Sequence, residues 1–223
     1  MITIIFVALV GLAISGGTFL AYQLMLNFHP GPAKVRKEVE KLMSTFDNIS
    51  SEFVPLNQKE LELISHSHTQ NEVRKGITTT AKGVIISIYE EPMIAYTYKR
   101  YTGKKENAAL LVRTANQELF FRIRNQQAKV SLNNQAVGII ERNGILYSPG
   151  DFRPLAKIEK KDRRETFPIM VEGKEVASLV AYDPTLRVHQ RALQFVGDLD
   201  KRQELFLLLM LSWELVREKE LGE

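Results

Sequence analysis

The chain of 223 residues carries 30 Lys and Arg against 26 Asp and Glu, giving a formal net charge of +4, and it has no cysteine. This mild positive excess excludes the strongly basic profile of a nucleic-acid-binding protein, so we expect no nucleic-acid partner. The lack of cysteine excludes disulfides, thiol catalysis and cysteine-based zinc sites. With 44% hydrophobic and 25% charged residues, the composition is that of one globular domain with an additional segment.

The first apolar run covers residues 2–26 and contains no charge, since the first charged side chain of the sequence is Lys34. At about 1.5 Å per residue this run is about 37 Å long, enough to cross a hydrocarbon core of about 30 Å. It predicts a transmembrane anchor helix over residues 1–27. A cleaved signal peptide is the alternative, but Lys and Arg are missing before the run. Because four Lys and Arg residues follow between positions 34 and 41, we expect a single-pass membrane protein with its C-terminal domain in the cytoplasm.

Small residues recur along this predicted anchor. Ala13, Gly17 and Ala21 follow each other at four-residue spacing, and Gly11 and Ser15 repeat the spacing on another face. Such patterns let two helix backbones approach closely, so they predict packing on a helix of another membrane protein. The alternative is composition alone, since membrane helices are in general rich in Gly and Ala.

Residues 28–75 read as a linker with short amphipathic helices. Val35, Val39, Leu42, Met43 and Phe46 recur at helical spacing with Lys and Glu opposite. This apolar stripe predicts a helix that lies either on a membrane surface or against the folded domain. Further along, Ser65-His66-Ser67-His68 would place two imidazoles on one side of a strand, but no third metal ligand is evident nearby. We therefore expect a solvated linker there, and neither a metal nor a cofactor.

Residues 76–223 form the predicted main domain. Up to about residue 196, short β-branched or alternating runs are separated by turn-forming pairs, which predicts ten or more antiparallel strands in a barrel or sandwich. Two of the hairpins align with each other, with turns at Asn133-Asn134 and Glu172-Gly173 that suit positive φ angles.

The second apolar run, at residues 205–211, is only seven residues long and too short to span a membrane. Asp200 and Gln203 are spaced as a capping box before it, so a helix is predicted. A helix that is apolar on nearly every face must be surrounded by protein. The expected fold is therefore mainly β (α+β), a closed antiparallel β-barrel around a hydrophobic C-terminal helix, preceded by one transmembrane helix.

Four segments carry a resemblance to a known family: NNQAVGIIER (133–142), EGKEVASLVAY (172–182), GDLDKRQE (197–204) and LFLLLMLSWELV (205–216). They resemble the tubby-like superfamily, which includes the tubby proteins and the phospholipid scramblases. The resemblance covers about two thirds of the chain and implies a closed barrel of about twelve strands around the C-terminal helix. It also implies that Asp198 and Asp200 match an acidic pair that scramblases carry before this helix and that has been linked with calcium; capping is the alternative role for Asp200. The chain departs from scramblases in lacking their cysteine-rich stretch.

The segment KIEKKDRR at 157–164 is the candidate ligand site. Its cations are Lys157, Lys160, Lys161, Arg163 and Arg164. Tubby proteins bind phosphorylated lipid headgroups through basic residues, so the resemblance implies a headgroup site; a solvated turn is the alternative.

Catalytic motifs are missing from the sequence, so we expect no enzyme. The leading hypothesis is a membrane-anchored binding or scaffold protein whose tubby-like barrel engages a membrane protein or anionic lipid of the bilayer. The alternative is scramblase-like phospholipid translocation.

Overall fold

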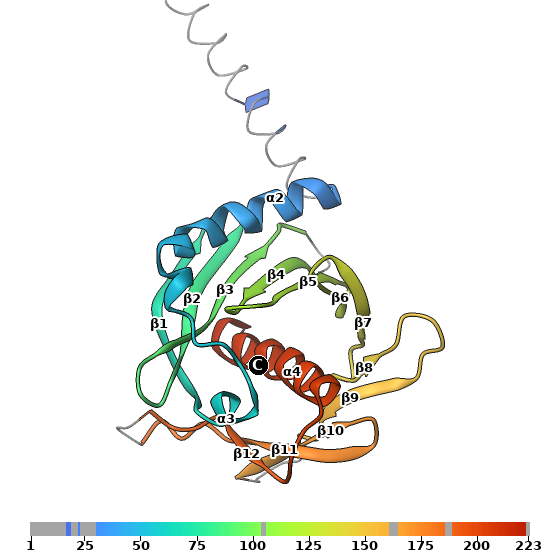
Figure 1. Ribbon diagram of the computed structural model, residues 1–223. Coiled ribbons are helices and arrows are strands. Elements are labelled where there is room, and N and C mark those ends of the chain that lie inside the picture. The colour runs from blue at the N-terminus through green and yellow to red at the C-terminus, as the bar shows by residue number, and fades with distance from the viewer. Residues whose placement is uncertain are drawn as a thin grey trace, which may run out of the picture.

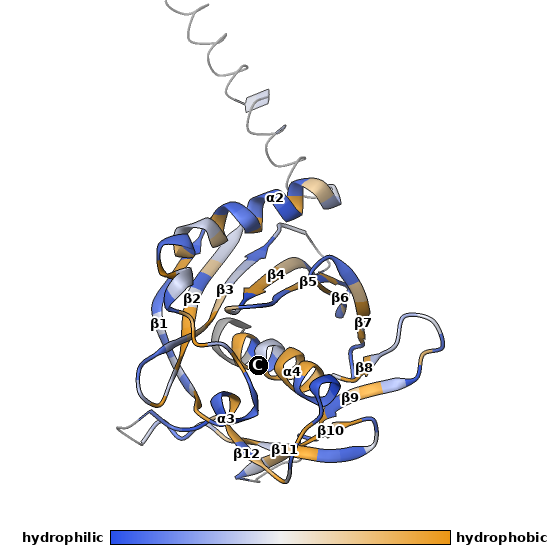
Figure 2. Ribbon diagram, viewed as in Figure 1, coloured by the Kyte–Doolittle hydropathy of each residue, from blue (hydrophilic) through white to orange (hydrophobic). Residues whose placement is uncertain are grey.

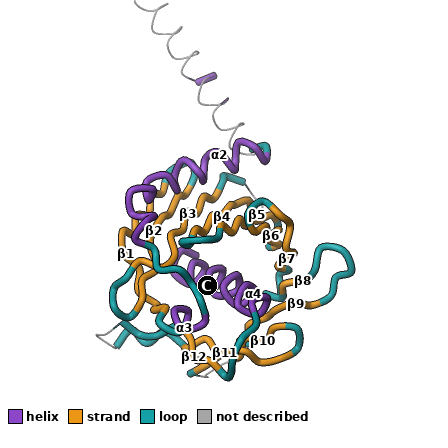
Figure 3. Tube along the Cα trace, viewed as in Figure 1, coloured by secondary structure: helices purple, strands orange, loops and turns teal. Residues whose placement is uncertain are grey.

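The structure is a computed structural model. It describes residues 17, 18 and 22 and residues 30–221, except 104–105, 161–164 and 186–188; within 218–221 it describes the backbone alone. In this part of the chain the fold is mainly β. One curved antiparallel sheet has helices on both its inner and its outer face (Figures 1 and 3).

The sheet contains twelve strands in the described residues, and every strand pairs with its neighbours in sequence. Such an order needs only hairpin connections, which suits short strands separated by turn-forming pairs. The strands are β1 (Ile64–Lys75), β2 (Thr79–Ser87), β3 (Pro92–Arg100), β4 (Asn107–Arg113), β5 (Glu118–Arg124), β6 (Gln127–Leu132), β7 (Gln135–Ile140), β8 (Leu146–Tyr147), β9 (Pro154–Ile158), β10 (Thr166–Val171), β11 (Lys174–Val180) and β12 (Leu193–Phe195). The helices are α2 (Pro32–Met43), the 3-10 helix η1 (Ser44–Glu52), α3 (Gln58–Leu61) and α4 (Lys201–Leu221).

Two-residue turns set the register of the two predicted hairpins. Asn133 and Asn134 join β6 to β7 with φ angles of 46° and 68°, and Glu172 and Gly173 join β10 to β11 with φ angles of 49° and 83°. Turns with positive φ at both central residues match the twist of antiparallel strands. The predicted turn positions are confirmed.

Helix α4 lies inside the curve of the sheet (Figure 1). Its side chains from Phe206 to Val216 are buried on all sides, and they form one core cluster with the inner faces of the strands. In Figure 2 the orange, apolar stretch of α4 lies inside the curve of the sheet. The helix is apolar all round because the sheet surrounds it, and burial of this surface is the main term that stabilises the fold.

The prediction of a closed barrel is wrong. The sheet runs from β1 to β12 and is not closed: in the described residues no ladder joins its two edge strands. The edges meet only around one isolated bridge between Ser65 and Arg191, and the Ala192 amide donates to the Ile64 carbonyl over 2.8 Å. Strand β12 covers only Leu193–Phe195 and pairs with β11. The contacts with β1 fall just before β12, at residues 190–192, and are too few to form a ladder.

The sheet begins earlier than the predicted domain start at residue 76, because Ile64–Lys75 form β1 within the segment interpreted as a linker. Only the first two residues of this strand are buried, and most of its second half is exposed. A strand that buries so little apolar surface has a polar sequence. The sequence therefore resembles a linker, although its backbone pairs with β2 over the length of the strand.

Helix α2 and η1 cover the outer face of β3 and β4. Of the predicted stripe, Val35, Val39, Met43 and Phe46 are buried there in a second core cluster, and Leu42 is half-buried. Of the two alternatives for this helix, packing on the domain is confirmed. The Tyr101 hydroxyl donates to Glu38 of α2 over 2.7 Å, and burial, with this hydrogen bond, raises the pKa of Tyr101 far above its ordinary value.

The predicted transmembrane helix over residues 1–27 falls outside the described residues except at positions 17, 18 and 22. Among the helices that the structure does describe, none combines the length and the apolar character needed to cross a membrane. At 21 residues α4 is long enough, but it carries charges such as Glu204, Glu214 and Arg217. The structure does not support a single-pass anchor. We therefore correct that prediction, together with the membrane localisation and the cytoplasmic orientation derived from it.

Candidate functional site

At one rim of the sheet, arginines replace the apolar side chains of the inner face. On β3, Tyr96 and Tyr98 are buried in the core around α4. Because side chains of a strand alternate between faces, Arg100 lies on the same face two residues later, at the end of the strand. The same step from buried Ile140 on β7 leads to Arg142, just past the strand. Both arginines therefore lie at the end of the space that α4 occupies.

Helix α4 contributes a third arginine. Trp213 and Arg217 are four residues apart and so lie on one face of the helix. The Trp213 ring stacks on Phe121 with ring centroids 5.4 Å apart, and the Arg217 guanidinium carbon lies 5.4 Å from the centroid of the Trp213 ring. A guanidinium over an indole is attracted by the negative face of the ring. The buried indole thus holds Arg217 at the rim.

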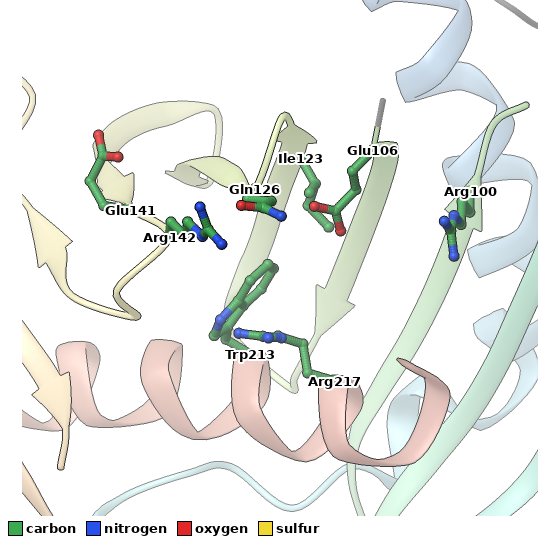
Figure 4. Close-up of a pocket in the computed structure, with 8 residues that line it drawn as sticks. All are labelled: Arg100, Glu106, Ile123, Gln126, Glu141, Arg142, Trp213 and Arg217. Atoms are coloured by element: carbon green, nitrogen blue, oxygen red, sulfur yellow. The ribbon is translucent and has the colours of Figure 1, made fainter. Parts of the chain in front are cut away.

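These residues surround a cavity of about 370 Å³, a volume that suits a small ligand. Figure 4 shows Trp213 and Arg217 rising from α4 toward Gln126, with Arg142 on one side and Arg100 on the other. The lining residues are Arg100, Glu106, Ile123, Gln126, Glu141, Arg142, Trp213 and Arg217. Three arginines against two glutamates leave the lining with a net charge of +1.

Two arginines of this cavity are exposed and unengaged. The side chains of Arg100 and Arg142 form no hydrogen bond or ion pair with another residue that the structure describes, and neither does that of Glu106. The Glu141 carboxylate, in contrast, already accepts two hydrogen bonds from the side-chain amide of Gln127, at 3.0 and 2.8 Å. The cavity therefore offers guanidinium donors to an incoming anion, and a planar guanidinium suits carboxylate and phosphate oxygens best.

The Trp213 indole carries a buried donor. Its side chain is only 6% exposed, and its Nε1 is buried without a hydrogen-bond partner among the described residues. A buried donor left unpaired costs about 1–3 kcal/mol of stability. Because solvent does not reach this atom, it is not one of the donors that the cavity presents to a ligand.

Arg122 lies near this rim but on the outer face of β5, and its role differs. Its guanidinium donates to the backbone carbonyls of Ala108 at 2.6 Å and Ile123 at 3.0 Å. Burial lowers the pKa of Arg122, and the nearby charge of Arg124 lowers it further. Arg122 is therefore engaged in holding neighbouring strands, although its charge adds to the positive field of the rim.

The predicted headgroup residues lie elsewhere. Lys157 on β9 pairs with Glu159, and Lys160 pairs with Glu214 of α4. Glu214 is a buried carboxylate on the core helix, so Lys160 supplies the counter-charge that this burial requires. The other three members, Lys161, Arg163 and Arg164, lie outside the described residues. The headgroup site at 157–164 stays a prediction.

The predicted helix-packing residues are mostly beyond the described part of the chain. Gly17 is described as helical and exposed, with nothing within 4 Å of the position where a Cβ would be. Gly11, Ala13, Ser15 and Ala21 lie outside the described residues.

His66 and His68 on β1 each contact a residue of another strand. His66 Nε2 lies 2.8 Å from the Val180 carbonyl oxygen, and His68 Nδ1 lies 3.1 Å from the Tyr96 hydroxyl. Across the described residues, no three His, Cys, Asp or Glu side chains are placed together to hold a metal.

A serine, a histidine and a glutamate meet where the two sheet edges approach each other. His189 Nδ1 lies 2.7 Å from Ser67 Oγ, and His189 Nε2 lies 3.0 Å from Glu90 Oε1. The order resembles that of a nucleophile, a base and an orienting acid. However, the Glu90 side chain is 74% exposed, so water screens its charge. These contacts link β1, the β2–β3 turn and the segment before β12, and we assign them to holding the two edges together.

Sequence reasoning missed the three arginines of the cavity. The sequence does contain a signal. Arg100 and Arg142 each lie two positions after a residue that faces the inside of the sheet, and Arg217 lies four positions after the single tryptophan. Reading it requires knowing which face of each strand is the inner one.

Comparisons with known proteins found no match to any protein-family model, curated protein or solved structure. The resemblance to the tubby-like superfamily accordingly stays a prediction.

Proposed function

We propose that the protein is a binding module for a small phosphate-bearing ligand, which enters the cavity lined by Arg100, Arg142 and Arg217. The observation that carries this proposal is that two guanidinium groups face one cavity without a partner among the described residues. With three arginines and two glutamates, the lining has a net charge of +1, which favours an anionic ligand.

Two further features support a phosphate. Arg217 is held by the Trp213 ring, so less side-chain entropy is lost when it binds an anion. A phosphate group also offers three acceptor oxygens, which match the planar guanidinium groups of the cavity. The resemblance to tubby-like proteins also implies a phosphorylated ligand, although through the basic segment at 157–164.

The test is a titration of the full chain with pyrophosphate. Trp213 is the only tryptophan, and it lines the cavity, so its fluorescence reports directly on the site. We expect a saturable change in emission, and we expect the affinity for pyrophosphate to fall as salt is added. Arg100→Gln and Arg142→Gln should each weaken binding about ten-fold or more, because a hydrogen bond to a charged group contributes about 1.5–3 kcal/mol.

Arg74→Gln is the matched control, because this arginine on β1 is 79% exposed and does not line the cavity. It should bind pyrophosphate as the parent does. The proposal is overturned if the parent protein shows no saturable response at millimolar pyrophosphate, or if Arg74→Gln weakens binding as much as the cavity variants do.

A further inference from the structure

A second groove adjoins the arginine-lined cavity. It has a volume of about 540 Å³ and is lined by Glu141, Arg142, Asn143, Tyr147 and Phe152. Two of these residues, Glu141 and Arg142, also line the first cavity. The two spaces therefore meet at Arg142, and a ligand whose anionic group lies in the cavity can extend into the groove.

The outer wall of this groove is an aromatic ring held in an unusual backbone conformation. Phe152 lies in the β8–β9 connection, which stands out from the sheet in Figure 1. Its side chain is 59% exposed, and its φ angle is +52°, a region that bulky residues rarely adopt. The connection is ordered by hydrogen bonds: the Ser148 amide donates to the Arg153 carbonyl over 2.9 Å, and the Ser148 hydroxyl donates to Asp151. The loop thus holds an exposed aromatic face beside the groove.

Two other side chains of the groove, Asn143 and Tyr147, are held by hydrogen bonds. The Asn143 side-chain amide donates to the Tyr147 hydroxyl over 3.2 Å, and its carbonyl oxygen accepts from the Ile145 amide over 3.0 Å. Two aromatic rings, Tyr147 and Phe152, line the groove together with the polar side chains of Glu141, Arg142 and Asn143. A planar heterocycle suits this lining, because it stacks through its face and makes hydrogen bonds through its edge.

We propose that the ligand is a nucleoside phosphate, with its phosphate held in the arginine-lined cavity and its base stacked on Phe152 in the adjoining groove. This inference rests on the proposed function, because the same arginines must bind the phosphate. It adds the class of molecule that carries the phosphate. The base interacts with Phe152 and the polar groups beside it, and Arg142 lies at the junction of the two parts.

The experiment compares adenosine monophosphate with ribose 5-phosphate by calorimetry and by Trp213 fluorescence on the full chain. Both probes carry the same phosphate, and only one carries a base. We expect adenosine monophosphate to bind about ten-fold more tightly, within the range of one base–aromatic stack. Phe152→Ala should remove this preference and leave the affinity for ribose 5-phosphate unchanged.

Tyr89→Ala is the matched control, because Tyr89 is an exposed aromatic residue, at 66%, that lines neither space. This variant should keep the preference for the nucleotide. Equal affinity for the two probes, or an unchanged preference in Phe152→Ala, overturns the nucleoside inference and leaves the phosphate site standing. If neither probe binds, the proposed function fails as well.

Discussion

The two ends of α4 are built in different ways. At the N-terminal end, Asp200 Oδ1 accepts hydrogen bonds from the amides of Arg202 at 2.8 Å and Gln203 at 2.9 Å, and the Gln203 side chain accepts from the Asp200 amide at 3.0 Å. Glu204 accepts in turn from the Gln58 amide of α3 at 3.0 Å. At the C-terminal end the helix reaches a cavity in which Arg100 and Arg142 have no partner among the described residues.

The N-terminal end of α4 therefore serves the stability of the fold, and the C-terminal end is the part that we propose to bind a ligand. Polar groups that stabilise a fold are placed opposite partners, because an unpaired buried group costs free energy. Charged groups gathered around a cavity without such partners contribute little to the fold, and under the proposed function they bind the ligand. We therefore expect substitutions at the N-terminal end of α4 to change stability, and substitutions of the cavity arginines to change binding.

The largest effect is expected between the two ends, at Leu209, which is fully buried among the strands. Leu209→Asp places a carboxylate in the core without a counter-charge, a cost of about 5 kcal/mol or more, comparable with the net stability of a domain. We expect the variant to lose its cooperative unfolding transition, measured by circular dichroism in denaturant. Leu209→Met is the volume-conserving control and should cost less than about 1.5 kcal/mol. A Leu209→Asp variant with a transition like that of the parent would show that α4 is not the core.

A smaller effect is expected at the pair between Lys160 and Glu214. The Glu214 side chain is 11% exposed and that of Lys160 is 44% exposed, so the pair is partly screened. Lys160→Ala leaves a nearly buried carboxylate unpaired and should cost about 1–2 kcal/mol in denaturant unfolding. Adding Glu214→Gln to this variant should restore part of the loss, since it removes the unpaired charge.

Lys157→Ala is the control for this pair. Lys157 is 42% exposed and pairs with a surface glutamate, so its loss should change stability by less than about 0.5 kcal/mol. Equal costs for the two lysines would show that Lys160 has no special role in the fold. Neither substitution should change pyrophosphate binding, because neither residue lines the cavity.

Features that depend on local pattern could be predicted from the sequence. The capping box at Asp200 and Gln203 is confirmed, as are the turns at Asn133-Asn134 and Glu172-Gly173. The burial of the apolar C-terminal helix also follows from its sequence, because a helix without a polar face must be enclosed. In each case the residues that determine the structure lie within a few positions of each other.

Features that depend on register between distant segments could not be predicted. Whether a sheet closes depends on pairing between its first and last strands, and nothing local to β12 shows that it is only three residues long. The cavity is assembled from the end of β3, the residues after β7 and the last turns of α4. Arg100 and Arg217 are far apart in sequence, so their chemistry becomes visible only when the fold brings them to one rim.

A cap substitution measures the structural end of α4 directly. Asp200→Ala removes the acceptor for two helix amides and should cost about 1 kcal/mol in denaturant unfolding. Asp198 is exposed and makes no side-chain contact with the described residues, so Asp198→Ala should change stability by less than about 0.5 kcal/mol. Similar costs at the two positions would mean that general charge, and not capping, explains the effect.

The smallest effect on stability is expected at the cavity beside the C-terminal end of α4. Arg100→Ala and Arg142→Ala should each leave the free energy of unfolding within about 0.5 kcal/mol of the parent, since neither guanidinium has a partner to lose among the described residues. Arg122→Ala is the informative comparison, because this neighbouring arginine donates to two backbone carbonyls and should cost about 1–3 kcal/mol. If Arg100→Ala destabilised the protein as much as Arg122→Ala, Arg100 would belong to the fold. The Arg100 guanidinium would then stabilise the fold, as the polar groups at the N-terminal end of α4 do, and would not be available to a ligand.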